Sequence, residues 1–321
     1  MEKILKSKIF LILSFLIFLT SCASIKRAEY FVPDAPVGGQ EGQSLGHQEQ
    51  GQQEQTSLEN SEIIKIVQIS DLHSNSYGKN QEKLIKKILA AQPDLIVFTG
   101  DIFDFEWPVE IAVERVEKIL SAIKEVCPFC FISGNHEYYL GHNNEYAGLF
   151  SDYGGVVLEN DVVSYEIKGV RVNVAGVSDP ISTLPEELRL NDGVDLEGFE
   201  KNLDYVAQAI AELPDGVNIL LAHRPEYIDL YKAPQVYDLI LSGHAHGGQW
   251  RFPFINGLYA PGQGLFPKYA GGRYVFPTEQ EGQTSVFIIS RGLSYQKPLF
   301  PRFGNPVELV EILVQTEAFR K

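Results

Sequence analysis

The sequence predicts an α/β fold in which two packed, mixed β-sheets are flanked by helices. Between residues 63 and 132 the pattern alternates strand, helix, strand, helix and strand. This order is typical of parallel strands joined by right-handed crossovers. Residues 162–177 match an antiparallel hairpin, and later apolar runs bring the total to roughly nine or ten strands and four or five helices. That number of elements is enough for two sheets.

The first part of the core follows directly from its periodicity. Predicted strands are residues 63–70, 95–99 and 129–132, and predicted helices are residues 81–91 and 109–126. The first helix carries Leu84 and Ile88 at helical spacing and ends before Pro93. The second strand, Leu-Ile-Val-Phe-Thr, is continuously apolar, as expected for a strand covered on both faces.

Shorter patterns continue to the C-terminus. Predicted strands are residues 156–158, 162–167, 170–177, 217–221, 237–241, 285–290 and 307–314, and predicted helices are residues 200–213 and 226–231. Lys168-Gly169 supplies the turn of the hairpin, because glycine readily adopts the backbone angles of tight turns.

The N-terminus predicts a targeting segment outside the fold. Basic residues precede an apolar run at residues 9–19, which is shorter than the ~20 residues of a membrane span. The run ends in Leu-Thr-Ser-Cys, which resembles a bacterial lipobox. We therefore expect residues 1–21 to be a signal peptide and Cys22 to be lipidated, giving an extracytoplasmic, membrane-anchored lipoprotein. An ordinary signal peptide and an uncleaved anchor helix are the alternatives.

Composition separates a linker from the folded domain. Residues 33–61 are rich in Gly, Gln and Glu and cannot bury enough apolar surface to become ordered. We expect a lipidated cysteine and disordered stalk at residues 22–61 and one domain at residues 62–321. The formal net charge of −15 argues against nucleic-acid binding, which depends on Lys and Arg at phosphates.

Cys127 and Cys130 form a C-x-x-C pair that leads into a predicted strand. A redox-active pair needs its first cysteine at a helix N-terminus, so we do not expect redox catalysis. A structural disulfide and two buried thiols both remain open.

Five of the seven histidines lie in four short clusters, and a Gly-Asp pair makes a fifth cluster. The clusters are Asp71-Leu72-His73, Gly100-Asp101, Gly134-Asn135-His136-Glu137, Ala222-His223-Arg224 and Gly243-His244-Ala245-His246. Each follows a predicted strand, and active residues of open α/β sheets gather beyond the carboxyl ends of strands. Carboxylate, amide and imidazole groups converging at one sheet edge suit a dinuclear site of divalent cations.

In this order the clusters resemble the calcineurin-like metallophosphoesterase superfamily, whose pattern runs D-x-H, G-D, G-N-H-[DE], H and G-H-x-H. The resemblance spans residues 63 to about 314 and implies a four-layer αββα sandwich. It implies that Asp71, His73 and His246 hold one cation, that Asn135, His223 and His244 hold the other, and that Asp101 bridges both. Manganese, iron and zinc all suit such ligands. The lipobox and Gly247-Gly248-Gln249 resemble a membrane-associated bacterial branch.

Other residues of the clusters have expected roles in catalysis. His136 resembles the histidine that protonates the leaving oxygen; a hydrogen bond behind a metal ligand is its alternative role. Glu137 occupies the family's Asp/Glu position and could orient His136. Arg224 could contact phosphate or form a surface ion pair. His142 is expected to be a solvated loop residue.

The resemblance implies hydrolysis of a phosphoester by a metal-bound hydroxide, without a covalent enzyme intermediate. We expect a phosphodiester or pyrophosphate substrate, such as an envelope lipid or a nucleotide-linked compound. Apolar residues at 258–261 and 265–267 could form a rim for acyl chains. A UDP-diacylglucosamine-type pyrophosphatase is the alternative among enzymes. A surface lipoprotein that keeps the fold only as a binding module is the alternative outside them.

Overall fold

The computed structural model describes residues 24–32, 63–189, 193–279, 283–295 and 301–316. The expected signal peptide, Cys22 and residues 33–61 of the expected stalk lie outside the described residues. Within the described part, no helix has the length and apolar character needed to cross a bilayer.

The first six-stranded sheet contains the βαβαβ unit predicted from the sequence. From edge to edge its strands are β1 (Lys26–Val32), β14 (Glu308–Gln315), β2 (Ile63–Ile69), β3 (Leu95–Thr99), β4 (Phe129–Ile132) and β5 (Val156–Val157). Strands β2 to β5 are parallel, and β14 runs antiparallel to β2. Helices α2 (Glu82–Ala90) and α3 (Val109–Ile123) form the crossovers, and α5 (Asn143–Asp152) precedes β5. The carboxyl ends of β2, β3 and β4 therefore share one edge.

The second six-stranded sheet is also mixed. Its strands in order are β12 (Gly272–Pro277), β13 (Thr284–Ile289), β9 (Leu239–Ser242), β8 (Val217–Leu221), β7 (Val170–Gly176) and β6 (Asp161–Ile167). The predicted hairpin is β6–β7, while β7, β8, β9 and β13 are parallel. Helices α7 (Leu196–Ala211) and α8 (Ile228–Lys232) cover this sheet, and a short pair, β10 (Tyr259–Ala260) and β11 (Gly264–Leu265), stands apart.

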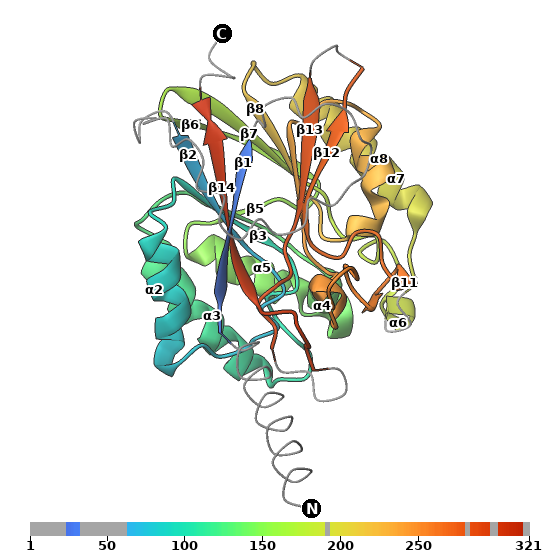
Figure 1. Cartoon of the computed structure of the whole chain (residues 1–321). Helices are drawn as coiled ribbons and strands as arrows, with labels where there is room; N and C mark the ends of the chain where they lie inside the picture. Colours follow the sequence, from blue (N-terminus) through green and yellow to red (C-terminus); the bar gives the residue numbers. More distant parts are fainter. Residues whose placement is uncertain (1–23, 33–62, 190–192, 280–282, 296–300, 317–321) are drawn as a thin grey trace, which may run out of the picture.

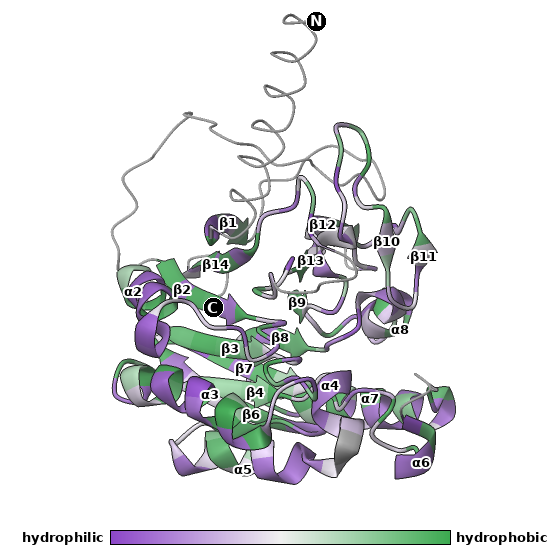
Figure 2. Cartoon of the chain, turned by 90° about the horizontal axis from the view of Figure 1, so that it is seen from below, coloured by the Kyte–Doolittle hydropathy of each residue, from purple (hydrophilic) through white to green (hydrophobic). Residues whose placement is uncertain are grey.

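Successive side chains of each strand point to opposite faces of its sheet, and their packing produces four layers. Ile66 faces the core between the sheets with Ile219, whereas its neighbour Val67 packs with Ile88 of α2. On the other side, Leu220 packs with Val206 of α7. In Figure 1 the strands lie between α2 and α3 on one side and α7 and α8 on the other, and in Figure 2 most strands are hydrophobic. The predicted fold class is confirmed.

A buried ion pair joins the end of β13 to the start of β14. The Arg291 guanidinium donates to Glu308 Oε2 over 2.6 Å, and the Arg291 backbone N–H donates to Glu308 Oε1 over 2.8 Å. Both residues are almost fully buried. Each charge therefore depends on the other for compensation.

The predicted boundary at residue 62 needs correction, because part of the expected stalk belongs to the sheet. Strand β1 pairs in parallel with β14, from Lys26 opposite Glu308 to Val32 opposite Val314. Ala28 and Val32 are buried against the sheet core. The segment is short and its partner lies at the far end of the chain, so local periodicity gave no signal for it.

Of the two alternatives for Cys127 and Cys130, the structure contains two free thiols. Cys130 is buried on β4, and its Sγ lies 3.3 Å from the Tyr165 hydroxyl. Burial raises the pKa of both thiols to about 12. Both thiols are therefore protonated near neutral pH.

Candidate metal centre

All seven candidate ligands follow the carboxyl ends of strands. Asp71 and His73 follow β2, Asp101 follows β3, Asn135 follows β4, His223 follows β8, and His244 and His246 follow β9. The first four come from one sheet and the last three from the other. The structure thus brings all of them together over the seam between the sheets, and each is buried.

The backbone at these positions is held in an unusual conformation. Five of the seven candidates have positive φ angles: Asp71 49°, His73 47°, Asp101 53°, His244 64° and His246 48°. Non-glycine residues adopt this left-handed region only at a cost in energy, and such residues cluster at functional sites. Glycine at position 134 is also required, because a Cβ there would overlap the Asp101 carboxylate. The loops are therefore built for close approach of the polar groups.

Hydrogen bonds fix which ring nitrogens of two histidines point inward. His73 Nδ1 lies 2.8 Å from an Asp104 carboxylate oxygen, and His223 Nδ1 lies 2.7 Å from the Thr99 carbonyl oxygen. Both partners are acceptors, so each Nδ1 donates its N–H and each Nε2 is the ring nitrogen that faces the centre. Asp101 Oδ2 lies 3.6 Å from His73 Nε2 and 3.2 Å from His223 Nε2. One carboxylate oxygen therefore lies between two imidazole Nε2 atoms, which is the arrangement expected of a bridging ligand.

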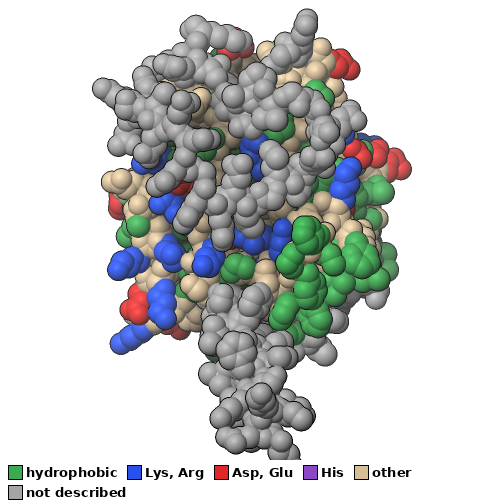
Figure 3. Space-filling view, viewed as in Figure 1, with side chains coloured by type: hydrophobic (Ala, Val, Ile, Leu, Met, Phe, Trp, Pro, Cys, Tyr) green, Lys and Arg blue, Asp and Glu red, His purple; other side chains and the backbone are tan. Residues whose placement is uncertain are grey.

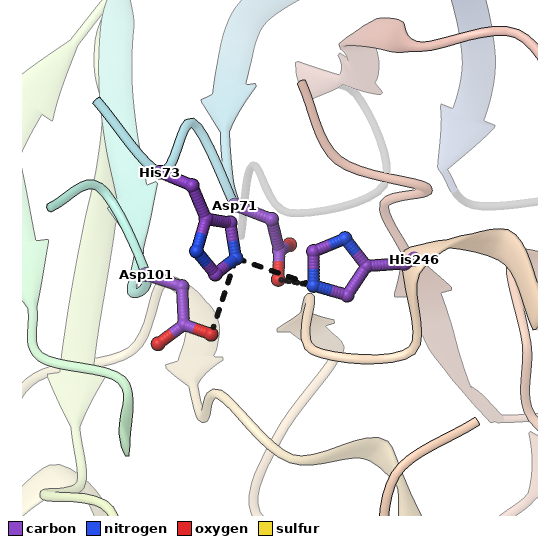
Figure 4. A group of neighbouring side chains, drawn as sticks. All are labelled: Asp71, His73, Asp101 and His246. Atoms are coloured by element: carbon purple, nitrogen blue, oxygen red, sulfur yellow. Dashed lines mark hydrogen bonds and ion pairs between the residues drawn. The ribbon is translucent and has the colours of Figure 1, made fainter. Parts of the chain in front are cut away.

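The remaining imidazoles complete two groups around this carboxylate. His246 Nε2 lies 3.2 Å from His73 Nε2 and 3.6 Å from Asp71 Oδ1, and Figure 4 shows these side chains pointing toward one another. On the other side of Asp101, His244 Nδ1 lies 3.2 Å from His223 Nε2. Ligand atoms of Asp71, His73, Asp101 and His246 lie close enough to share one ion, as do those of Asp101, His223 and His244.

Asn135 presents an amide oxygen with the properties of a ligand. Its Nδ2 donates to the Tyr139 hydroxyl over 3.0 Å, which fixes the orientation of the amide. Its Oδ1 is buried and has no hydrogen-bond donor among the described residues. A buried acceptor without a donor is costly unless a cation compensates it. The donor set therefore fits hard or borderline divalent cations.

Glu137 has a structural role that the sequence did not reveal. Its Oε1 accepts backbone N–H bonds from Ile102 and Phe103, and its Oε2 accepts them from Asp101 and Gly134, over 2.7–3.0 Å. The hypothesis that Glu137 orients the His136 ring is therefore corrected. It clamps the loop that carries Asp101, because only a carboxylate can accept four N–H bonds at this place.

Asp104 is the residue beside His136, and sequence reasoning missed it. Its Oδ1 lies 3.5 Å from His136 Nδ1, while its Oδ2 binds His73. The His136 ring also stacks on Phe105, with centroids 5.2 Å apart, and meets the His73 ring edge-on at 4.4 Å. Its position three residues after Asp101 in a loop was the available signal. The ring of His136 is thus held directly beside a candidate ligand.

Arg224 is neither a surface residue nor free to approach a phosphate. It is buried, and its Nε donates to Asp179 Oδ2 over 2.8 Å. Asp179 had no signal in the sequence, because it lies in a loop after β7. The prediction of an ion pair holds for Arg224, but the predicted surface location is wrong. His142, by contrast, is exposed and lies 3.2 Å from Glu145, as expected for a loop residue.

Arg302 is a buried arginine that the sequence did not single out. Its Nε donates to the Ser294 carbonyl oxygen over 2.6 Å, and its NH2 group lies 3.5 Å from His246 Nδ1. Unlike Arg224 and Arg291, it has no carboxylate partner among the described residues. A buried guanidinium therefore lies behind one of the candidate ligands; burial lowers its pKa to about 10, although Tyr77 and Asp71 act to raise it.

The buried carboxylates create a demand for positive charge. Burial raises the pKa of Asp71 to about 6. Burial also acts to raise the pKa of Asp101, but His223 and His136 outweigh it and hold that pKa well below its usual range. Burial acts to lower the pKa of His223, yet the Asp101 carboxylate outweighs it and raises that pKa to about 10. Asp101 thus attracts positive charge, which the protonated ring of His223 supplies and which a bound cation would supply in its place.

Comparison with known proteins agrees with this geometry. The profile described as calcineurin-like phosphoesterase matches residues 64–248, more than half of the chain. The chain is 29% identical over 236 residues to the metallophosphoesterase YkuE of Bacillus subtilis, covering 72% of each protein. It is 27% identical over 281 residues to the UDP-2,3-diacylglucosamine pyrophosphatase LpxG of Chlamydia trachomatis, covering 77% of this chain and 82% of that protein.

A third relative is matched over less of its length. The chain is 27% identical over 190 residues to the protein YpbG of Bacillus subtilis, covering 59% of this chain and 63% of that protein. The chain thus spans less than two thirds of YpbG.

Proposed function

Because the chain belongs to the calcineurin-like phosphoesterase family and is a hydrolase acting on phosphoester bonds, we propose that its buried Asp/His cluster holds two divalent cations. One would be held by Asp71, His73 and His246, and the other by Asn135, His223 and His244, with Asp101 between them. The observation that carries this proposal is the position of Asp101 Oδ2, 3.6 Å from His73 Nε2 and 3.2 Å from His223 Nε2. Manganese, iron and zinc are the candidates.

Divalent cations held by these residues would supply Lewis acidity, which makes water a stronger nucleophile and stabilises negative charge on the phosphoryl group. His136 would then give a proton to the leaving oxygen. Its ring is partly exposed, stands edge-on to His73, and is oriented by Asp104. Asn135 adds an oxygen ligand without adding negative charge next to an anionic substrate.

We further propose that residues 1–21 are removed as a signal peptide and that lipid on Cys22 tethers the domain outside the cytoplasm. The basic n-region, the short apolar run and the lipobox-like Leu-Thr-Ser-Cys support this location. The correction at β1 leaves residues 33–62 between the first strand and the rest of the domain, so the tether joins the fold near residue 25.

The proposed substrate is a phosphodiester or pyrophosphate of the cell envelope. The tether and the similarity to LpxG support a lipid-linked compound, and the UDP-diacylglucosamine class named for LpxG is the second candidate. Exposed apolar residues at 258–266 support the same choice, because they offer a surface for acyl chains.

Metal content and turnover of the same preparations test this proposal. Wild-type protein should hold about two divalent cations per chain, and Asp101→Asn should lose most of both because it removes a shared ligand. Asp152→Asn, at the exposed end of α5, is the matched control and should keep them. With manganese supplied, activity should appear on bis-p-nitrophenyl phosphate or lipid pyrophosphates. A protein that holds no metal tightly and hydrolyses none of these substrates would contradict the proposal.

A further inference from the structure

The segment that follows the last candidate ligand exposes an aromatic surface. Among the described residues, fourteen large hydrophobic side chains are exposed, and six of them lie between residues 250 and 266. They are Trp250, Phe252, Phe254, Tyr259, Leu265 and Phe266, with Phe254 fully exposed and Leu265 and Phe266 68% and 63% exposed. We call these six side chains the aromatic face. In Figure 3 a hydrophobic surface lies at the lower right, where Figure 1 places β11. A group of this density marks a binding surface, because exposed hydrophobic side chains that have no binding role are usually scattered singly.

The aromatic face is held in place by the fold. Strands β10 and β11 pair through Tyr259 opposite Leu265, and the indole N–H of Trp250 donates to the Pro301 carbonyl oxygen over 2.8 Å. The backbone N–H of Arg251 donates to the Phe303 carbonyl oxygen over 2.8 Å. A surface that is already ordered loses little conformational entropy when it binds.

Two of the exposed rings are also placed at a cost to the isolated domain. Phe254 and Phe266 have φ angles of 75° and 56°, in the left-handed region that bulky side chains rarely adopt. Each ring is therefore presented to solvent by a strained turn. Strain together with apolar exposure is unfavourable for the free domain, and burial of the rings against a partner would offset it.

The charged residues around the aromatic face favour an anionic partner. Residues 239–278 contain no Asp or Glu, although the chain as a whole carries a net charge of −15. Of the three basic residues in the same stretch, Lys268 is exposed, whereas Arg251 and Arg273 are half-buried; Lys and Arg side chains also adjoin the left side of the hydrophobic surface in Figure 3. Exposed Trp, Tyr and Phe with neighbouring Lys and Arg, and without acidic residues, suit the interface of an anionic bilayer.

We propose that the aromatic face docks onto an anionic lipid bilayer, with Phe254, Leu265 and Phe266 among the acyl chains. Trp250 is only four residues after His246, so docking would place the candidate metal centre next to the lipid surface. Docking itself does not depend on catalysis. The delivery of a lipid phosphoester to the centre rests on the proposed function.

The two tryptophans of the chain allow a direct test. Full-length Trp107→Phe retains only Trp250, and Trp250→Phe retains only Trp107, whose ring contacts Arg115 of α3 and does not belong to the aromatic face. Each variant is reconstituted into vesicles of phosphatidylcholine and phosphatidylglycerol, with brominated or unbrominated acyl chains. Bromine quenches tryptophan only on contact, so the readout reports where the bilayer touches rather than whether the chain is anchored.

Brominated vesicles should quench Trp250 and leave Trp107 unchanged. In the Trp107→Phe background, Phe254→Ser with Phe266→Ser should weaken docking by roughly a hundredfold, because each buried ring contributes about tenfold. Tyr205→Ser is the matched control, since Tyr205 is 60% exposed on α7. Equal Trp250 fluorescence in the two vesicle preparations would overturn the proposal. A concentration-dependent blue shift of Trp250 without lipid would also overturn it, because that result would assign the aromatic face to a second copy of the chain.

Discussion

Replacing Glu137 with glutamine should destabilise the domain severely, although the two side chains have nearly the same shape. The Glu137 carboxylate is fully buried and accepts four backbone N–H bonds, two on each oxygen. Glutamine has one acceptor oxygen, and its NH2 group would face two N–H donors in either orientation. Two buried amides would therefore lose their acceptor.

Each buried amide left without a partner costs roughly 1–3 kcal/mol, so the substitution should lower the free energy of unfolding by about 2–6 kcal/mol. That is a large part of the ~5–15 kcal/mol that holds a domain folded. Two of the four amides belong to Asp101 and Ile102, so the loop carrying Asp101 should also lose its fixed position. Manganese affinity should fall together with stability.

Urea unfolding followed by circular dichroism, with a manganese titration of the same samples, measures both effects. Glu159→Gln is the matched control. Glu159 accepts one backbone N–H, from Ser133, and two hydroxyl bonds, from Tyr138 and Ser178. Hydroxyls can reverse from donor to acceptor, so this glutamine should cost less than about 1 kcal/mol. Burial raises the pKa of Glu137 to about 7. If the Glu137→Gln variant had the same free energy of unfolding as wild type, the four N–H bonds would not require a charged carboxylate, and the proposed role of Glu137 as a clamp would be refuted.

Three further predictions concern the leaving group, buried charges and the thiols. His136→Gln should lower kcat about 100-fold or more on substrates with poor leaving groups and much less on p-nitrophenyl esters; equal losses on both would contradict a general-acid role. Glu308→Ala should lower the free energy of unfolding by about 3–5 kcal/mol, because it leaves Arg291 buried and unpaired. Arg302→Met should leave that free energy unchanged or raise it, since it removes a buried cation that has no carboxylate partner among the described residues. Urea unfolding measures both variants, and a similar loss of unfolding free energy in both would contradict this difference between the two arginines. Burial raises the pKa of the Cys130 thiol to about 12, so iodoacetamide at pH 8 should label it only after unfolding, as mass spectrometry can show.

The sequence predicted those features that depend on local pattern. Strands β4 and β8 match the predicted residues 129–132 and 217–221, because continuous apolar runs between turn residues mark buried strands. The candidate ligands could be placed at the carboxyl ends of strands because each follows such a run, but the expected single sheet edge is wrong, since the ligands come from two sheets.

Features that depend on distant partners could not be predicted. Strand β1 is ordered by pairing with β14, which lies near the other end of the chain. The role of Glu137 depends on amides of another loop, and the burial of Arg224 depends on Asp179. In each case the sequence gives the residue type, but it does not show which distant group is its binding partner.

Each proposed ligand set draws on both sheets. Asp71 and His73 lie on the first sheet and His246 on the second, while Asn135 lies on the first and His223 and His244 on the second. Neither half of the chain contains a complete set, so tight cation binding would have to follow the docking of the sheets during folding. Bound cations would in turn cross-link the two sheets. Loss of metal should then loosen the whole sandwich, and metal supply would limit the maturation of the protein as well as its turnover.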